Sequence, residues 1–302
     1  MNDSYSSVGH PTERESVQRD LTAEGATAIE SGAIRALSKH WPEYLMEGAE
    51  LGTFMISACV FTVLLEYPGS PVYQAIGDPF LRRALVGLAM AATAITIVYS
   101  GWGKQSGAHF NPAVTLTFLR LKKIAPWDAA FYIVAQFAGS IAGVALASLF
   151  IGMALAHRNV NYAVTAPGPT GPLVAFAAEV IISFVLLTTV LNVSNRKNLS
   201  RYTGLFAGAL VATYITFEAP FSGMSMNPAR TFGSAFGARA FGNLWIYFVA
   251  PPIGMLLAAE IYMRMRSSEK VYCAKLNHNN SKRCIFRCRF AELDNSTATP
   301  GK

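Results

Sequence analysis

SGAHFNPAVT, residues Ser106 to Thr115, returns 116 residues later in the chain as SGMSMNPART, residues Ser222 to Thr231. Six of the ten positions are identical. Both copies contain Asn-Pro-Ala, as Asn111, Pro112 and Ala113 and as Asn227, Pro228 and Ala229. Each copy follows a long apolar stretch and precedes a segment too short and too mixed to cross a membrane by itself. The chain is therefore predicted to contain two versions of one unit.

Each Asn-Pro-Ala motif is expected to begin a helix. Asparagine is a favoured N-cap, and proline is favoured at the first helical position, where its missing N–H is no loss. Gly107 and Gly223 supply flexible backbone before the motifs, so each segment should be extended up to the asparagine and helical after it. Irregular backbone at membrane depth needs burial in protein or a wet cavity. The repeat therefore predicts two short half-helices that start inside the membrane.

The composition indicates a membrane protein. Of the 302 residues, 52% are hydrophobic and only 14% are charged, against about a quarter in soluble chains. A bilayer crossing needs roughly 20 predominantly apolar residues. Windows that meet or approach this length are Tyr44–Leu65, Ala84–Trp102, Ala129–Ala156, Leu173–Val193, Tyr202–Phe217 and Phe241–Ala259. We therefore predict an all-α membrane protein with six transmembrane helices and two re-entrant half-helices.

The positions of lysine and arginine indicate the orientation. The polar first forty residues do not resemble a signal peptide, so both ends are expected on the cytoplasmic side. The positive charges then predicted inside are Lys39, Lys104, Arg120, Lys122, Lys123, Arg196, Lys197, Arg201, Arg264 and Arg266. Those predicted outside are Arg82, Arg83, Arg158 and Arg239. An excess of positive charge inside agrees with the usual bias of cytoplasmic loops.

The expected organisation has three parts: a polar cytoplasmic segment 1–40, a channel domain 41–264 and a basic cytoplasmic tail 265–302. Within the channel domain, the first repeat spans about 41–156 and the second about 171–264. Three crossings per repeat place the second copy upside down relative to the first, as an inverted repeat with a pseudo-two-fold axis in the membrane plane. We expect this inversion to bring the two half-helix starts together at the membrane centre.

Two helix N-termini that face one point create a lane for neutral solutes. Each N-terminus carries roughly half a positive elementary charge, which disfavours a cation or hydronium ion. The side-chain amides of Asn111 and Asn227 can donate to a passing oxygen, and the loop carbonyls can accept. A water bound as an acceptor to both amides cannot relay a proton. For a single copy, a plain helix cap is the simpler interpretation, but two copies in matching membrane context favour a pore.

The C-terminal tail contains Cys273, His278, Cys284 and Cys288. Their spacing matches no standard zinc knuckle, so the sequence predicts neither a metal site nor a cofactor, but a solvated and partly disordered tail. The net charge of +7 lies in the cytoplasmic flanks and this tail rather than on one basic, aromatic-laced face. No nucleic-acid partner is therefore expected, and the basic tail stretch is a candidate for contact with anionic lipid.

The paired motifs and their surroundings resemble the major intrinsic protein family, the aquaporins and glycerol facilitators. Besides SGAHFNPAVT, the resemblance rests on the NPARTFGSA string, on Glu50 and Glu179 in the opening helices, and on Gln136, and it covers about Tyr44 to Met263. It implies a homotetramer with one pore per protomer, passive conduction of water or small neutral solutes, and no cofactor. In view of this family, Glu50 and Glu179 are expected to support the half-helix loops, and His109 to line the inner vestibule or brace its loop.

The resemblance also implies a selectivity filter. Arg230 matches the arginine of the family's outer constriction, and ungapped counting adds Ala91, Ile215 and Met224. These three depart from the aromatic, histidine and small residues of water-selective members, which leaves glycerol, urea or ammonia as alternative solutes. Other markers favour water: glycerol facilitators resemble one another in having aspartate where Thr231 stands and lysine where Ala235 stands. Water, with other small neutral solutes, is the expected permeant.

Two further classes compete with a passive channel. An ion-coupled secondary transporter also has inverted repeats and broken helices, but this sequence places no carboxylate beside the half-helices to carry a coupling ion. An enzyme is disfavoured because the membrane region has no nucleophile with a paired base, no phosphate-binding glycine loop and no metal-ligand pair. The sequence favours the channel.

Overall fold

The computed structural model describes residues 13–266 and 271–295, and all regular elements in these ranges are helical. The chain divides into two compact units, Met1–Trp41 and Pro42–Lys302. In the first unit, the described residues form the beginning of α1 (Glu13–Glu66). The polar N-terminal segment is therefore helical from Glu13 onward.

The second unit contains the membrane-length helices. Five helices in the described ranges are long and apolar enough to cross a membrane: α1 over Gly32–Glu66, α3 (Pro79–Tyr99), α6 (Pro126–Ile151), α8 (Pro172–Ser194) and α12 (Leu244–Arg266). The remaining predicted span, Tyr202–Phe217, forms α9 (Thr203–Phe217), whose 15 residues rise only about 22 Å. The helical turns η2 (Ser200–Tyr202) and α10 (Ala219–Ser222) flank it.

The half-helices begin where the sequence predicts. They are α5 (Pro112–Arg120) and α11 (Pro228–Ala238), each with proline at its first position. The remaining short elements are α2 (Pro71–Ala75), α4 (Gly101–Ser106), α7 (Met153–Ala156), η1 (Asn161–Ala163) and α13 (Phe290–Asn295).

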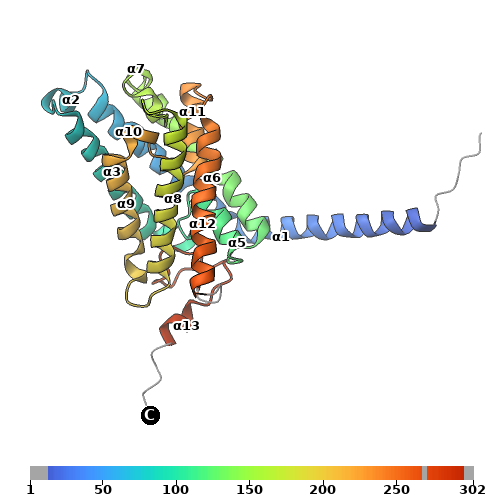
Figure 1. Ribbon diagram of the computed structural model, residues 1–302. Coiled ribbons are helices and arrows are strands. Elements are labelled where there is room, and N and C mark those ends of the chain that lie inside the picture. The colour runs from blue at the N-terminus through green and yellow to red at the C-terminus, as the bar shows by residue number, and fades with distance from the viewer. Residues whose placement is uncertain (1–12, 267–270, 296–302) are drawn as a thin grey trace, which may run out of the picture. The chain divides into compact units, whose positions relative to one another are not determined.

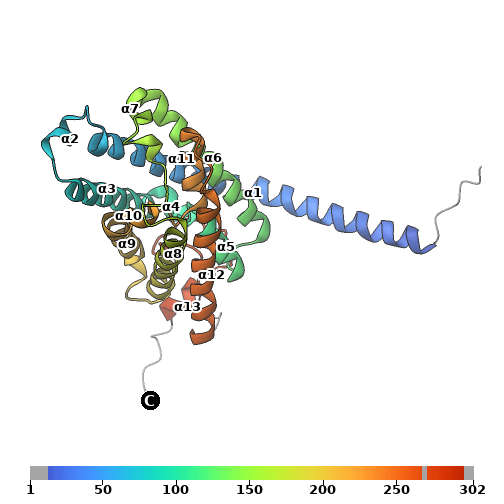
Figure 2. The ribbon, with the colours of Figure 1, turned by 45° about the horizontal axis from the view of Figure 1, so that its top comes forward.

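The helices of the two repeats are interlocked. Helix α3 runs alongside α9, and α8 runs alongside α12 (Figures 1 and 2). The first half-helix, α5, packs against α12 of the second repeat, and the second, α11, packs against α6 of the first. Each half-helix is thus held partly by the other half of the chain.

Glycines allow α1 and α6 to approach each other closely. A Cβ atom added to Gly139 or Gly143 of α6 would collide with the backbone of Gly48 or Gly52 of α1. Gly48 and Gly52 are four residues apart in α1, and Gly139 and Gly143 are four residues apart in α6. Each helix therefore presents small residues along one face, as is common where membrane helices touch. This contact brings the carboxylates of α1 close to the first re-entrant loop.

In the second repeat, one buried carboxylate holds the loop that precedes the half-helix. Glu179 on α8 accepts hydrogen bonds from the backbone N–H groups of Ser225 (2.6 Å) and Met226 (2.8 Å), and from the Ser222 hydroxyl (2.9 Å). These amides lie outside any helix and need a partner at membrane depth. Glu179 therefore satisfies two backbone amides and one hydroxyl of the loop for which the family resemblance implies a supporting carboxylate.

In the first repeat, two carboxylates share this task, and the principal one is not Glu50. Glu47 accepts from the N–H groups of His109 (2.8 Å) and Phe110 (2.6 Å), whereas Glu50 bonds only the Ser106 hydroxyl (2.7 Å). Glu50 thus contacts the segment before the half-helix through the serine, whereas Glu47 accepts from the loop's backbone amides. Because Glu47 lies one helical turn before Glu50, both face the loop, and sequence alone does not distinguish them.

Two buried tyrosines also hold the segments that precede the half-helices, through hydrogen bonds to backbone carbonyls. The Tyr132 hydroxyl donates to the Ser106 carbonyl (2.7 Å), and the Tyr247 hydroxyl donates to the Ser222 carbonyl (2.5 Å). Both side chains are fully buried. The two loops therefore have matching hydrogen-bond partners, as their shared sequence requires.

The C-terminal segment from residue 271 to 295 packs against the second unit. Val271, Ala274 and Phe286 are buried, and the Leu276 N–H donates to the Gly107 carbonyl (3.0 Å). The prediction of a solvated, partly disordered tail is wrong for this segment. Its apolar residues are too scattered to form a regular pattern, but they fit against the first re-entrant loop.

The carboxylate network predicts different effects for two neighbouring glutamates. Glu47→Gln replaces one acceptor oxygen by a donor opposite a backbone N–H, and should lower stability by about 1–3 kcal/mol. Glu50→Gln keeps an acceptor for the Ser106 hydroxyl, so its loss should be clearly smaller. Thermal unfolding of the detergent-solubilised variants measures both. Equal losses, or a larger loss for Glu50→Gln, would show that Glu47 is not the main support.

Candidate functional site

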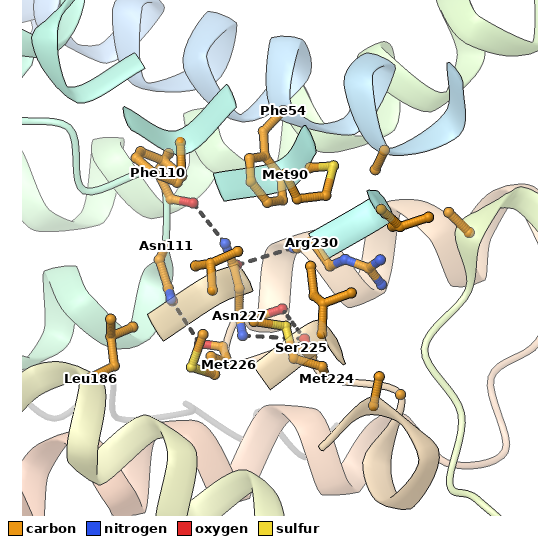
Figure 3. Close-up of a pocket in the computed structure, with 18 of the residues that line it drawn as sticks. Phe54, Met90, Phe110, Asn111, Leu186, Met224, Ser225, Met226, Asn227 and Arg230 are labelled. Carbon is orange, nitrogen blue, oxygen red and sulfur yellow. Dashed lines mark hydrogen bonds between the residues drawn. The ribbon is translucent and has the colours of Figure 1, made fainter. Parts of the chain in front are cut away.

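The two Asn-Pro-Ala asparagines cap their half-helices and also bridge the two repeats. The Asn111 side-chain oxygen accepts from the Ala113 N–H (2.9 Å), and that of Asn227 accepts from the Ala229 (3.0 Å) and Arg230 (3.1 Å) N–H groups. Each Nδ2 donates to the loop of the other repeat: Asn111 to the Met226 carbonyl and Asn227 to the Phe110 carbonyl, both at 2.7 Å (Figure 3). The helix starts thus meet as the inverted repeat predicts, and each amide keeps a second N–H for another acceptor.

The loops before the caps contain strained backbone. Ala108 (φ 56°) and Phe110 (φ 30°) in the first loop match Met224 (φ 51°) and Met226 (φ 55°) in the second. Left-handed conformations are uncommon for residues other than glycine, and they persist only where surrounding contacts enforce them. Here the glutamates and tyrosines described above enforce them. Strain at equivalent positions in both loops marks these segments as the functional part of the molecule.

A cavity of about 470 Å³ contains both asparagines in its wall. One side of the wall comes from α3, where Val86, Met90, Ala94 and Val98 recur every four residues and so share one helix face. Val211 and Ile215 of α9 and Leu186 of α8 add further apolar surface. The cavity therefore combines a broad apolar wall with polar groups at the two motifs and at Thr62, Glu66, Arg83 and Asn159.

Three of the four predicted filter residues lie in this wall. Ile215, Met224 and Arg230 line the cavity, but Ala91 does not. The Ala91 carbonyl instead lies toward α9, where it limits the space at Gly208. The prediction of Ala91 is wrong because ungapped counting carried no marker for the rotation of α3. Met90, one residue earlier, lies on the cavity face.

Arg230 forms no salt bridge with any of the described residues. No carboxylate lies within salt-bridge distance of its guanidinium, and its buried Nη1 has no hydrogen-bond partner. Within the described ranges, Arg230 is therefore not held by an ion pair with a loop carboxylate. Its positive charge and unused donors belong to the cavity wall.

His109 braces its loop and also lines the cavity. Its Nδ1 lies 3.1 Å from the Thr115 hydroxyl, and its Nε2 lies 2.9 Å from the Ala274 carbonyl. The ring stacks between Phe118 and Phe286. His109 thus contacts the first half-helix through Thr115 and the C-terminal segment through Ala274, and it lies in the cavity wall.

Sequence reasoning missed several residues of the site. Met90 could have been found from the four-residue spacing of Val86, Met90 and Ala94, which share one face of α3. Phe54 and Phe110 line the cavity beside the motifs, and no local pattern distinguishes them from other core aromatics. Leu276 also lines the cavity, although its sequence context predicts a partly disordered tail.

Comparisons with known proteins agree with this geometry. The profile of the family described as Major intrinsic protein matches residues 39–262. Aquaporin NIP2-3 of Zea mays is 32% identical over 263 residues, which cover 86% of this chain and 83% of that protein. Glycerol uptake facilitator protein-like 6 of Lactiplantibacillus plantarum is 37% identical over 212 residues, which cover 69% and 92% respectively.

A solved structure shares the fold. The X-ray structure of the aquaglyceroporin from Plasmodium falciparum superposes with a TM-score of 0.60 at 23% identity, covering 74% of this chain and 96% of that chain. The family profile spans well over half of the sequence, and two Asn-Pro-Ala half-helices meet beside the cavity. The chain therefore belongs to the major intrinsic protein family and is a multi-pass, non-enzymatic membrane channel for water or small neutral solutes.

Proposed function

We propose that this protein is a passive channel that conducts water together with other small uncharged solutes and excludes ions and protons. The observation that supports this most is the meeting of the Asn111 and Asn227 amides in the wall of one cavity. Each asparagine is fixed by its helix cap and by the opposite loop, so its remaining N–H has little freedom. A solute oxygen at this point accepts hydrogen bonds without any rearrangement of the protein.

Charge explains the exclusion of cations. The N-termini of α5 and α11 carry partial positive charge toward the asparagines, and Arg230 adds a full charge in the same cavity. Glu47 and Glu179 are fully buried behind the loops, so their carboxylates are not exposed to the cavity. The negative charge in the cavity wall is that of Glu66 on α1. A neutral solute avoids this repulsion. A water that accepts from both amides has its hydrogens directed away from them, which interrupts proton relay.

The apolar wall supports a range of small solutes. Met90, Ile215 and Met224 offer no hydrogen bonds from their side chains, so a permeant molecule finds its polar partners elsewhere in the wall. These are the loop carbonyls, the asparagine amides, His109 and Arg230, together with Thr62, Glu66, Arg83 and Asn159. The alternative is a facilitator with a wider filter, whose principal solute is glycerol, urea or ammonia. One similar protein is named a glycerol uptake facilitator-like protein, and others are named aquaporins.

The proposed setting is a homotetramer in the plasma membrane with both termini in the cytoplasm. The bias of lysine and arginine supports the orientation. Large apolar side chains such as Leu149 (76% exposed) and Phe150 (83% exposed) point outward from α6. Such surface suits lipid or neighbouring protomers.

An ion-coupled transporter is the alternative from another class. It needs a carboxylate that loads and releases an ion during alternating access. The buried Glu47 and Glu179 are instead engaged in loop hydrogen bonds, which favours a static support. Uphill, saturable flux driven by an ion gradient would support the transporter.

Stopped-flow light scattering on reconstituted vesicles tests the proposed function. Osmotic water flux should exceed that of protein-free vesicles several-fold, with no dependence on a proton or sodium gradient. Parallel uptake measurements with glycerol, urea and ammonia rank the other solutes. Water flux equal to that of empty vesicles, with correctly assembled protein, would refute water conduction. Fast glycerol uptake with little water flux would favour the facilitator alternative.

Arg230 provides a second test. Arg230→Gln removes the fixed charge and should raise proton or cation leak while water flux persists, as measured with a pH-sensitive dye inside the vesicles. Arg239→Gln is the matched control, because Arg239 is an exposed residue at the end of the same half-helix. Proton leak that is unchanged in Arg230→Gln, or equal in both variants, would contradict a role of this charge in exclusion.

A further inference from the structure

Four side chains of the C-terminal segment converge at one point. Cys273, His278, Cys284 and Cys288, here named the Cys3His cluster, have their ligand-type atoms all within 4.8 Å of one another. The Cys273 and Cys284 sulfurs are 3.6 Å apart, and the Cys288 sulfur lies 2.9 Å from His278 Nε2. The four cysteines of the chain are free thiols, so none of these sulfurs is committed to a disulfide.

The separations fit a tetrahedral metal ion. With Zn–S bonds of about 2.3 Å and a Zn–N bond of about 2.0 Å, the edges of such a tetrahedron are about 3.5–3.8 Å. The Cys273–Cys284 separation of 3.6 Å is close to the S–S edge, the Cys288–His278 separation of 2.9 Å is shorter than the S–N edge, and all four ligand-type atoms lie within 4.8 Å of one another. Three soft sulfur donors and one imidazole are a standard structural zinc set, and four protein ligands leave no open position for catalysis.

The surroundings suit thiolate ligands. Three thiolates and a divalent ion leave a net negative charge, and the Lys275 and Lys123 ammonium groups interact electrostatically with the thiol groups. The Phe290 N–H points to the Cys288 sulfur (3.4 Å), and the Phe290 ring stacks on His278 with centroids 4.3 Å apart. Such outer contacts orient metal ligands.

A metal ion bound by these four side chains would link parts of a segment that has little regular secondary structure. Between residues 271 and 289 it has no helix or strand, yet Cys273, Lys275 and Asn277 are buried. Its ends are joined by the hydrogen bond from the Arg289 N–H to the Tyr272 carbonyl (2.8 Å). Its apolar residues, among them Val271, Ala274 and Phe286, are buried against the rest of the second unit, and metal binding supplies additional folding free energy in comparable small modules.

The same segment touches the first re-entrant loop. Leu276 donates to the Gly107 carbonyl, Ala274 accepts from His109, and the Arg287 N–H donates to the Lys123 carbonyl beyond the first half-helix (2.9 Å). We propose that Cys273, His278, Cys284 and Cys288 bind one structural Zn²⁺ ion, which fixes the C-terminal segment against this loop at the edge of the cavity. The site is independent of which solute the channel conducts.

Metal analysis of the full-length protein tests the site. Protein purified in detergent without a metal-affinity tag should contain about one zinc per chain. Cys284→Ser should lower zinc to background, whereas Cys59→Ala, a substitution of the cysteine that lies in α1, should retain it. Zinc that persists in Cys284→Ser would overturn the proposal. So would metal-free wild-type protein with reduced thiols, or a Cys273–Cys284 disulfide detected by mass spectrometry.

Two measurements on the wild-type protein keep the test independent of the variant's folding. Replacement of zinc by Co²⁺ should produce the visible absorption of tetrahedral cobalt with thiolate ligands. Treatment with a chelator should speed tryptic cleavage at the exposed Lys282, Arg283 and Arg287 several-fold, and added Zn²⁺ should reverse the effect. Octahedral cobalt spectra, or cleavage that does not respond to chelation, would refute a site that fixes the segment.

Discussion

Backbone groups that lie at membrane depth without helical partners are the constraint on which this structure depends. The loops before both half-helices leave amides and carbonyls unpaired by any helix, and no bulk water is there to satisfy them. Buried glutamates accept hydrogen bonds from the loop amides. Buried tyrosines donate to one carbonyl at each loop, and the two cap asparagines donate to another. With these groups satisfied, the remaining polar atoms of the loops are available to a solute.

The local features of the pore could be predicted because they follow from helix-end chemistry. Asn111 and Asn227 cap their helices for reasons contained within three residues of sequence, and their repetition indicated that the two caps meet. The residues that support the loops were harder to assign. Glu47 and Glu50 are on the same side of α1, and only the rise and rotation of that helix against Gly139 and Gly143 determine which carboxylate reaches the amides.

The errors have one physical origin, namely that sequence spacing does not fix helix rotation or long-range packing. Ala91 and Met90 differ by about 100° around α3, so a shift of one residue exchanges a cavity residue for one in a helix contact. The C-terminal segment has no periodicity, and its C-x4-H-x5-C-x3-C spacing is irregular. Its burial depends on the shape of the first re-entrant loop, which the tail sequence cannot reveal.

The crossed hydrogen bonds between the repeats have a consequence for biogenesis. A chain inserted from its N-terminus places Asn111 and Phe110 in the bilayer before Asn227 and Met226 have been synthesised. The Asn111 amide and the Phe110 carbonyl then lack their final partners, and each unsatisfied group costs several kcal/mol in lipid. The first half-helix therefore gains its full set of hydrogen bonds only once the second half of the chain is in place.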